Sequence, residues 1–316
     1  MNSLTEALDS YLTLRRSLGV VMRAPGASLR RFVQFLDAEG ARFITTELAV
    51  RWATTSEPSD VMPAGWARRL ECVRGFAAWL SATEPRTEVP PRGLLPHNYR
   101  RRPPYIYSDD EVGRIVEETR RLPSSLGLRA HSYSTLFGLL SSTGLRLGEA
   151  LALDRDDVDL RNGVLAIRRS KSGGSRFVPV HRTTCAALRR YASQRDLAIP
   201  SPTASAFLIS ERGKRLSKEN AEYNFAVVSR TVGLRSPTTR YRHGHGPRLH
   251  DMRHRLAVQV LIRWYRDGRD VDRELPKLSA YLGHVQVADT YWYIEAVPEL
   301  LALASQRAMK SREERR

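Results

Sequence analysis

AHSYSTLFGLLSSTGLRLGEALAL, residues 130–153, predicts a buried helix, a glycine turn at Gly144 and a second helix that begins near Arg146. Most of the stretch is apolar, so we expect it to lie inside a domain. Arg146 and Glu149 are polar exceptions one helical turn apart. An arginine in a buried helix is most often paired with a carboxylate for structural reasons, and Glu149 stands in the right place to be that partner.

Downstream of this segment, GVLAIRRSKSGGSRFVPV (residues 163–180) shows two short β-rich runs around a Ser/Gly turn, which predicts a hairpin. Ser108 and Glu111 form a capping box that opens the domain. Helices are predicted over about 183–197, 217–231 and 249–266, and over everything beyond 274. We therefore expect a second domain, residues 105–316, that is mainly α with a small antiparallel β-sheet.

Upstream, residues 1–84 read as several short amphipathic helices. In AGWARRLECVRGFAAWL, apolar residues recur at three- and four-residue steps; they are Trp66, Leu70, Val73, Ala77 and Leu80. Residues 85–104 contain six prolines and the basic run Arg100–Arg102, so they predict a semi-rigid linker. This linker is either a solvated tether or a strap that lies on DNA phosphates.

The charge of the 316-residue chain is strongly positive, because 51 Lys and Arg against 34 Asp and Glu leave +17. This balance favours a polyanionic partner. An anionic membrane is the rival, yet no stretch approaches the roughly 18 apolar residues of a spanning helix, and the N-terminus does not resemble a signal peptide. Two cysteines, Cys72 and Cys185, support neither a disulfide framework nor a Cys-type zinc site. We expect a cytoplasmic, nucleoid-associated protein.

Several polar residues interrupt apolar contexts in the second domain, and each by itself is a weak signal. Lys171 is one of only five lysines, yet a lysine at a hairpin tip is usually solvated. His250 and His254 have the spacing of a zinc pair, but no glutamate base and no third ligand accompany them. Tyr291 and Trp292 are most simply packing residues. A basic cluster at residues 212–218 is either a solvated surface or a phosphate contact.

Taken together, the ordered segments TGLRLGEAL, RSKSGGSRFVPV, LHDMRHRLA, YLGH and TYWYIE resemble the tyrosine recombinases, or phage integrase family, across essentially the whole second domain. The resemblance implies a helical, SAM-like core-binding domain followed by the catalytic domain. It also implies a set of catalytic residues with Glu149 in support: Arg146, Lys171, His250, Arg253, His284 and Tyr293. The nucleophile of the family usually lies nine residues beyond the histidine of Leu-Gly-His, which is Tyr293.

Helix geometry supports the choice of Tyr293 over Tyr291 independently of the family. Successive helical residues turn by about 100°, so two residues that are two positions apart point to nearly opposite faces. Only one of the two phenols can therefore face a pocket, provided that the segment is helical. Tyr291 and Trp292 then serve as packing that fixes the segment.

The chemistry of the family explains these residue types. Two arginine forks, Arg146 and Arg253, suit the nonbridging oxygens of a phosphodiester, and His284 would donate to the same oxygens. His250 is the candidate base for the Tyr293 phenol, and Lys171 the candidate acid for the departing 5′-oxygen. The product is a 3′-phosphotyrosine, which conserves the phosphodiester energy. Neither ATP nor a metal or other cofactor is needed, and Glu149 would orient His250 or an arginine.

The resemblance also implies partners: double-stranded DNA recombination sites, a homotetramer on two duplexes with the two domains gripping opposite sides, and accessory directionality proteins. The tail after Tyr293 has an apolar stripe that docks either on a neighbouring protomer or on its own domain; its members are Val297, Leu300, Leu301 and Ala304. Two alternatives stay open, an inactive DNA-binding protein on this scaffold and a type IB topoisomerase. The segment DTYWYIE favours an integrase of a mobile element, active in integration, excision or transposition.

Overall fold

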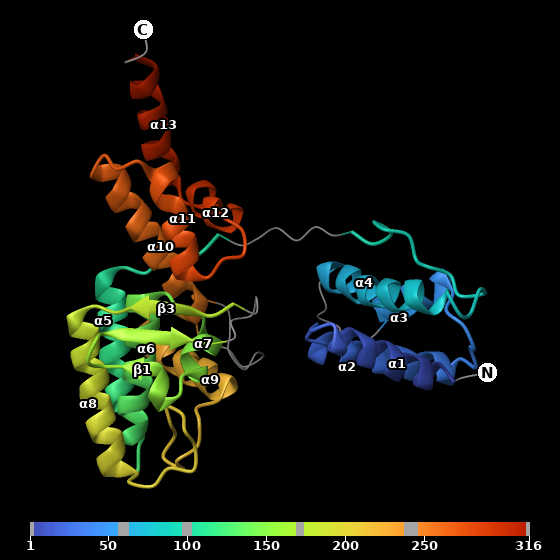
Figure 1. Cartoon of the computed structure of the whole chain (residues 1–316), viewed down its shortest axis with the longest axis horizontal. Coiled ribbons are helices and arrows are strands. Elements are labelled where there is room, and N and C mark those ends of the chain that lie inside the picture. Colours follow the sequence, from blue (N-terminus) through green and yellow to red (C-terminus); the bar gives the residue numbers. More distant parts are fainter. Residues whose placement is uncertain (1–2, 56–62, 97–102, 169–173, 237–245, 314–316) are drawn as a thin grey trace. The chain divides into compact units, whose positions relative to one another are not determined.

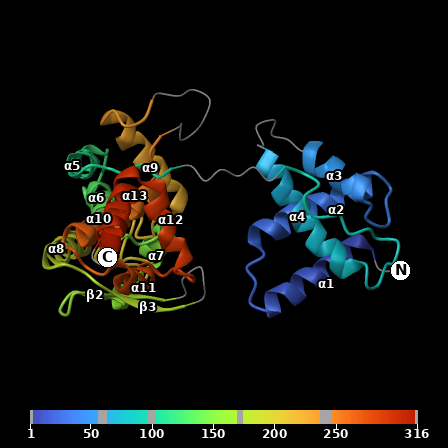
Figure 2. The same cartoon turned by 90° about the horizontal axis from the view of Figure 1, so that it is seen from above.

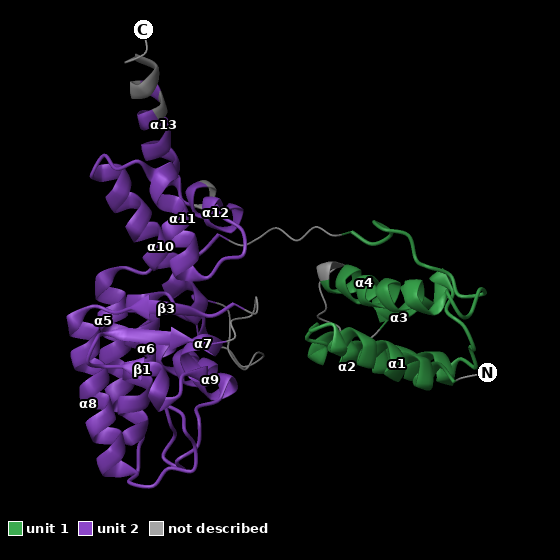
Figure 3. Ribbon diagram, viewed as in Figure 1, with its two compact units in different colours: residues 1–102 green, residues 103–316 purple. Residues whose placement is uncertain are grey.

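The structure is a computed structural model, and it describes residues 3–55, 63–96, 103–168, 174–236 and 246–313. The chain divides into two compact units, residues 1–102 and residues 103–316 (Figure 3). Each unit has its own buried core. The predicted linker limits, 85 and 104, stay a prediction, and the basic run Arg100–Arg102 lies outside the described residues.

Helices alone make up the regular structure in the described part of unit 1. They are α1 (Leu4–Ser17), α2 (Arg23–Ala38), α3 (Thr46–Thr55) and α4 (Pro63–Leu80) (Figure 1). Their apolar faces meet in one core. The stripe predicted on α4 is confirmed, because Leu70, Val73, Ala77 and Leu80 are all buried and Trp66 is half-buried.

The segment after α4 is held against unit 1 by hydrogen bonds to the start of α3. The Glu88 backbone N–H donates to the Ile44 carbonyl at 2.8 Å, and the Thr46 N–H donates to the Glu88 carboxylate at 2.8 Å. The first residues of the proline-rich stretch therefore pack on the helical unit.

Unit 2 begins with helices packed around a central one. These elements are α5 (Asp109–Glu118), the 3-10 turn η1 (Thr119–Arg121), α6 (Leu128–Thr143) and α7 (Leu147–Ala152). The predicted capping box is confirmed, because Ser108 Oγ accepts from the Glu111 N–H while the Glu111 carboxylate accepts from the Ser108 N–H. The turn between α6 and α7 is also confirmed: Gly144 ends α6 with a left-handed φ of 63°.

A three-stranded antiparallel sheet follows, in the order β1-β2-β3. Its strands, preceded by the 3-10 turn η2 (Arg155–Asp157), are β1 (Val158–Asp159), β2 (Val164–Ile167) and β3 (Arg176–Pro179). The register pairs Leu165 with Val178, and both are buried. The predicted hairpin of β2 and β3 is confirmed, whereas the two-residue β1 is too short for a sequence pattern to show. Lys171 lies outside the described residues.

Six helices complete the described chain: α8 (Arg182–Ala198), α9 (Lys218–Thr231), α10 (Leu249–Arg266), α11 (Val271–Leu282), α12 (Ala288–Ala296) and α13 (Pro298–Glu313). The predictions for α8 to α10 are confirmed. Beyond 274 the described chain is mostly helical, as predicted, and it forms three separate helices. Gly283, with a left-handed φ of 70°, ends α11, and Val297 is extended because Pro298 follows it.

The buried apolar residues in the described part of unit 2 form two clusters, which together make its core. In one, α5, α8 and α10 pack on α6 beside the sheet; in the other, α10 packs with α11, α12 and α13 (Figures 1 and 2). Because α10 belongs to both clusters and α11 also contacts β3, the end of α11 lies where helices and sheet meet. Within the described residues, no helix is both long and apolar enough to cross a membrane.

Candidate active site

Three arginines from three separate elements converge on the C-terminal end of α11. The last carbonyls of a helix lack intrahelical partners and carry partial negative charge, so they attract cations. The bonds run from Arg176 Nε to the Tyr281 oxygen (2.9 Å), from Arg253 Nη2 to the Leu282 oxygen (2.6 Å) and from Arg146 Nη2 to the Gly283 oxygen (2.9 Å). Three consecutive carbonyls therefore accept hydrogen bonds from guanidinium groups on three elements: the start of α7, β3 and α10.

Glu149 joins two of these arginines. Its carboxylate accepts from Arg146 Nη1 at 2.8 Å and from Arg176 Nη1 and Nη2 at 3.1 and 2.8 Å. Burial by itself would raise the pKa of Glu149, but the hydrogen bonds from Arg176 and Arg146 outweigh it and lower that pKa. The expected pairing with Arg146 is present, and the second partner is Arg176 rather than His250.

Arg253 is the most deeply buried of the three, with 2% of its surface exposed. Besides Leu282, it donates from Nη1 to the Gly144 carbonyl at 2.8 Å, so it ties α10 to the end of α6. Burial lowers the pKa of Arg253 to about 10; the nearby charge of Arg146 adds to this effect and the Tyr293 phenol opposes it. The guanidinium therefore stays protonated at pH 7.

Sequence reasoning missed Arg176, although the strand pattern contains a signal for it. Alternate residues of a strand share a face. Val178 is fully buried while Phe177 is exposed, so Arg176 faces inward with Val178. An inward-facing arginine beside the predicted Lys171 hairpin requires a buried partner, which the structure supplies as Glu149.

His250 is the second residue of α10, three positions before Arg253. Although part of the residue stays open to solvent, desolvation of the ring and then the positive charge of Arg253 lower the pKa of His250 to about 4. Asp251 opposes this shift, and Arg248 and Arg146 add to it. The imidazole is therefore neutral at pH 7 and able to accept a proton.

Aromatic rings and imidazoles form the other side of the site. His254 is buried, with ring centroids 4.7 Å from His250, 5.3 Å from Trp292 and 5.4 Å from Tyr293. Sequence reasoning considered His254 only as half of a zinc pair. Its place one helical turn after His250 was the available signal for a shared face.

The two tyrosines of α12 point to different environments. Tyr293 has 2% of its surface exposed, whereas Tyr291 has 43% and donates to Asp272 at 3.4 Å. The segment is helical, as the angular argument required. Tyr293 is therefore the phenol that faces the arginines and imidazoles.

His284 follows Gly283 directly and lies beside Tyr293. The two rings stack with centroids 6.2 Å apart and an interplanar angle of 24°. His284 Nδ1 lies 2.8 Å from the hydroxyl oxygen of the fully buried Thr290. The contact between Nδ1 and Thr290 helps to set the orientation of the imidazole ring.

The described part of unit 2 thus brings together Arg146, Glu149, His250, Arg253, His284 and Tyr293, and Lys171 lies outside it. Among the described residues, no three His, Cys, Asp or Glu side chains lie so that they could hold a metal ion. Two further histidines of the RHGHGPRLHDMRH segment, His243 and His245, lie outside the described residues as well.

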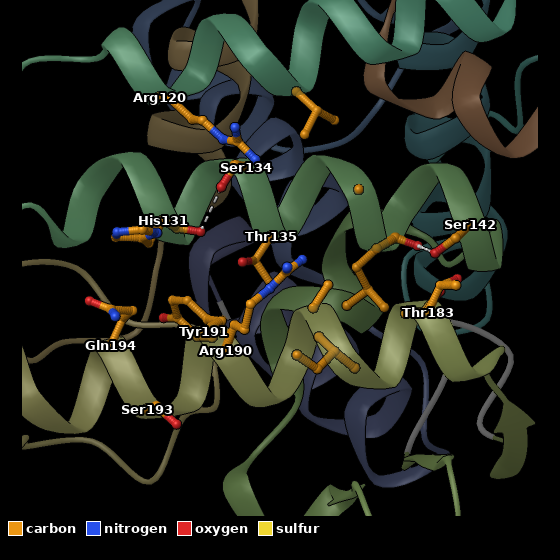
Figure 4. Close-up of a pocket in the computed structure, with 16 residues that line it drawn as sticks. Arg120, His131, Ser134, Thr135, Ser142, Thr183, Arg190, Tyr191, Ser193 and Gln194 are labelled. Carbon is orange, nitrogen blue, oxygen red and sulfur yellow. Dashed lines mark hydrogen bonds between the residues drawn. The ribbon is translucent and has the colours of Figure 1, made fainter.

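A separate groove of about 710 Å³ runs between α6 and α8 (Figure 4). Arg120, Thr135 and Arg190 are among the residues that line it, and none of the candidate site residues does. The arginine and tyrosine cluster is therefore not part of this groove.

Comparison with known proteins identifies the family. The sequence model described as "Phage integrase family" matches residues 107–299. The Sinorhizobium fredii (strain NBRC 101917 / NGR234) protein named "Putative integrase/recombinase y4rB" is 44% identical over 319 residues, which cover 100% of each chain.

Two solved structures share the fold. One is the XerH site-specific recombinase bound to palindromic difH substrate in a post-cleavage complex, with a TM-score of 0.62, 16% identity and coverage of 89% of this chain and 77% of that one. The other is a lambda integrase tetramer bound to a Holliday junction, with a TM-score of 0.62, 15% identity and coverage of 92% and 77%. The predicted fold class is thereby confirmed, and the chain belongs to the phage integrase family of tyrosine recombinases.

Proposed function

We propose that this protein is a site-specific DNA recombinase that cuts and rejoins strands through a phosphotyrosine at Tyr293. One observation carries the proposal: Arg253 and Arg146 donate to the adjacent carbonyls of Leu282 and Gly283, immediately before His284, whose ring stacks on Tyr293. Two fixed cations, a hydrogen-bond donor and a phenol within one small region are what transesterification of a phosphodiester requires.

The proposed step forms one bond to phosphorus and breaks one. The Tyr293 phenolic oxygen attacks the phosphorus, and the 5′-oxygen of deoxyribose leaves. Arg146 and Arg253 balance the charge that develops on the nonbridging oxygens, and His284 donates to the same oxygens. The number of phosphoester bonds is unchanged, so a 5′-hydroxyl of a second strand can reverse the step and seal the DNA.

Two proton transfers accompany the exchange. His250 takes the phenolic proton, a role that a neutral imidazole at pH 7 supports. Lys171 gives a proton to the 5′-oxygen, because an alkoxide is a poor leaving group. Glu149 holds Arg146 through its bond to Nη1 and is a positioning residue.

The burial of Tyr293 has a consequence for this reaction. A phenol with 2% exposure cannot meet a phosphate of duplex DNA in this arrangement. We therefore infer that α12 or the side chains around Tyr293 shift when DNA binds. The ring contacts of Tyr293 with His254 and His284 are individually weak, so such a shift can exchange them for contacts with DNA.

The partners follow from the same proposal. The net charge of +17 supports binding to duplex recombination sites, with affinity that falls steeply as salt rises. The XerH complex with difH substrate supports action on DNA sites, and the lambda integrase tetramer on a Holliday junction supports action as a tetramer. In α13, Leu300 is buried within its own unit while Leu301 and Met309 are exposed, so the start of the tail packs in cis and its remainder is open to a neighbouring protomer. Integration or excision of a mobile element, with accessory proteins, is the proposed setting.

The test uses nicked duplexes that tile the DNA flanking the encoding gene. A nick beside the cut site releases the short 5′-hydroxyl strand, so the covalent intermediate accumulates. We expect wild type and Tyr291→Phe to form a phenol-stable adduct on one sequence, and Tyr293→Phe to form none. Tyr291 is the matched control, because it lies on the same helix but points to Asp272.

Other outcomes would replace the proposal. An adduct formed equally on unrelated duplexes, together with relaxation of supercoiled DNA, would indicate a type IB topoisomerase. Tight binding to one sequence without an adduct would indicate a DNA-binding protein whose site has lost its activity.

A further inference from the structure

We propose that Arg176 is a positioning residue of the active site, which locks Glu149 and the end of α11 so that Arg146 and Arg253 present their remaining donors to the scissile phosphate. The inference rests on the proposed function. It starts from the position of Arg176, which contacts both the carboxylate that holds Arg146 and the helix end that holds Arg253.

Because of these contacts, Arg176 has few N–H donors left to bind DNA. A guanidinium has five N–H donors. Arg176 donates one to the Tyr281 carbonyl and two to the two oxygens of Glu149. Its side chain is 13% exposed, half the 26% of Arg146. Arg176 therefore acts through other residues, whereas Arg146 keeps a face open to solvent.

Gly283 shows how closely Arg176 approaches the end of α11. A Cβ atom added at Gly283 would lie 2.6 Å from Arg176 Nη1 and 2.8 Å from Arg176 Cζ. Gly283 is also the residue that turns the chain from α11 to His284. The guanidinium of Arg176 thus lies directly against the turn that leads to His284.

Arg176 lies in β3, so its contacts also connect the hairpin of β2 and β3 to the candidate site. Arg176 pairs with Ile167 in the register of β2 and β3, the two strands that flank the loop of Lys171. One side chain therefore connects three parts of the proposed machinery: the hairpin strands, the Arg146–Glu149 pair and the turn before His284. Its loss would leave Glu149 with Arg146 alone and free the Tyr281 carbonyl.

The experiment compares Arg176→Met with Arg168→Met in the full-length protein. Arg168 is a matched control, because it flanks the same hairpin and pairs with a buried carboxylate, that of Asp157 at 2.6 Å, but is itself 68% exposed. Hydrogen exchange is measured at the Gly283 and His284 amides, which donate to Ala280 and Ser279. We expect about tenfold faster exchange in Arg176→Met and no change in Arg168→Met, since exchange reports local opening.

A cleavage assay separates positioning from a general loss of stability. Adduct rates are measured on the natural phosphate and on a neutral methylphosphonate at the same position. Displacing a phosphate clamp by about 1 Å costs about 100-fold, so we expect a loss of about that size with phosphate. The loss should shrink to about tenfold or less with methylphosphonate, because a neutral group depends less on guanidinium charge. Arg176→Lys keeps the charge but lacks the fork, so it should resemble Arg176→Met.

Each result decides the inference. Unchanged exchange at Gly283 and His284, equal losses on both substrates, or full activity of Arg176→Lys would each overturn it. If wild type formed no adduct on any DNA, the proposed function would fail, and the exchange comparison would still decide whether Arg176 anchors the turn.

Discussion

The two sides of the candidate site are held together by different forces. On the arginine side, defined by Arg146, Glu149, Arg176 and Arg253, charged donors meet a carboxylate and helix carbonyls with fixed geometry. On the aromatic side, defined by His250, His254, His284, Trp292 and Tyr293, the rings contact one another with centroids 4.7–6.2 Å apart. Charge-assisted hydrogen bonds are stronger than single ring contacts, and arginine–carboxylate pairs also fix geometry. The comparison supports our proposal of a preformed phosphate clamp that faces a movable nucleophile.

The largest expected effect is on the arginine side. Glu149→Ala leaves Arg146 and Arg176 without their shared carboxylate in a buried setting, which we expect to lower the free energy of unfolding by about 3–5 kcal/mol. Urea denaturation measures this. Asp110→Ala, which breaks the exposed pair with Arg114, should cost less than about 1 kcal/mol. Equal costs for both variants would contradict a special role for the arginine side.

The second prediction concerns the turn at Gly283, which Arg176 contacts. Gly283 and Gly268 have nearly the same left-handed φ, 70° and 68°, but a Cβ at Gly268 would meet nothing within 4 Å. We expect Gly268→Ala to cost about 1–2 kcal/mol from backbone strain alone. Gly283→Ala should cost about 1 kcal/mol more, because it displaces Arg176. Matching costs in urea denaturation would show that the turn does not depend on that contact.

A smaller effect is expected on the aromatic side. His254→Leu replaces the imidazole with an apolar side chain of similar size and removes the ring contacts with His250, Trp292 and Tyr293. We expect a loss of about 1–2 kcal/mol, measured in the same way, and little loss for His131→Leu at an exposed position. A cost above that of Glu149→Ala would reverse the comparison between the two sides.

The smallest effect is a pH dependence from His250. Its pKa in the folded protein, about 4, is below the ordinary 6.5, so between these values the unfolded state binds more protons. The contribution of His250 to stability is therefore present above pH 6.5 and is lost as the pH falls toward 4. We expect the thermal midpoint of wild type to fall more than that of His250→Gln between pH 7.5 and pH 5. A smaller fall for wild type would mean that the pKa is raised instead.

Patterns that are local in the chain were predictable. The turn at Gly144, the hairpin of β2 and β3 and the opposite directions of Tyr291 and Tyr293 all follow from neighbours within a few residues. The helix end at Gly283 is local in the same sense, because a glycine commonly follows the last residue of a helix.

The arginine side was less predictable because its partners are far apart in sequence. Arg176 and Tyr281 are separated by 105 residues, and Arg253 and Gly144 by 109. Only tertiary packing brings such groups together, so no local periodicity reveals them. The arrangement of His254 between His250 and Tyr293 likewise depends on how α12 packs on α10.

The central claim is that Tyr293, and no other residue, becomes bonded to DNA. Mass spectrometry of tryptic peptides from the trapped adduct, after nuclease digestion, measures this directly. The account predicts a nucleotide phosphate on the Tyr293 oxygen of the peptide that also contains Tyr291, with fragment ions placing the mass on Tyr293. A nucleotide on Tyr291 or on any other residue would contradict the account.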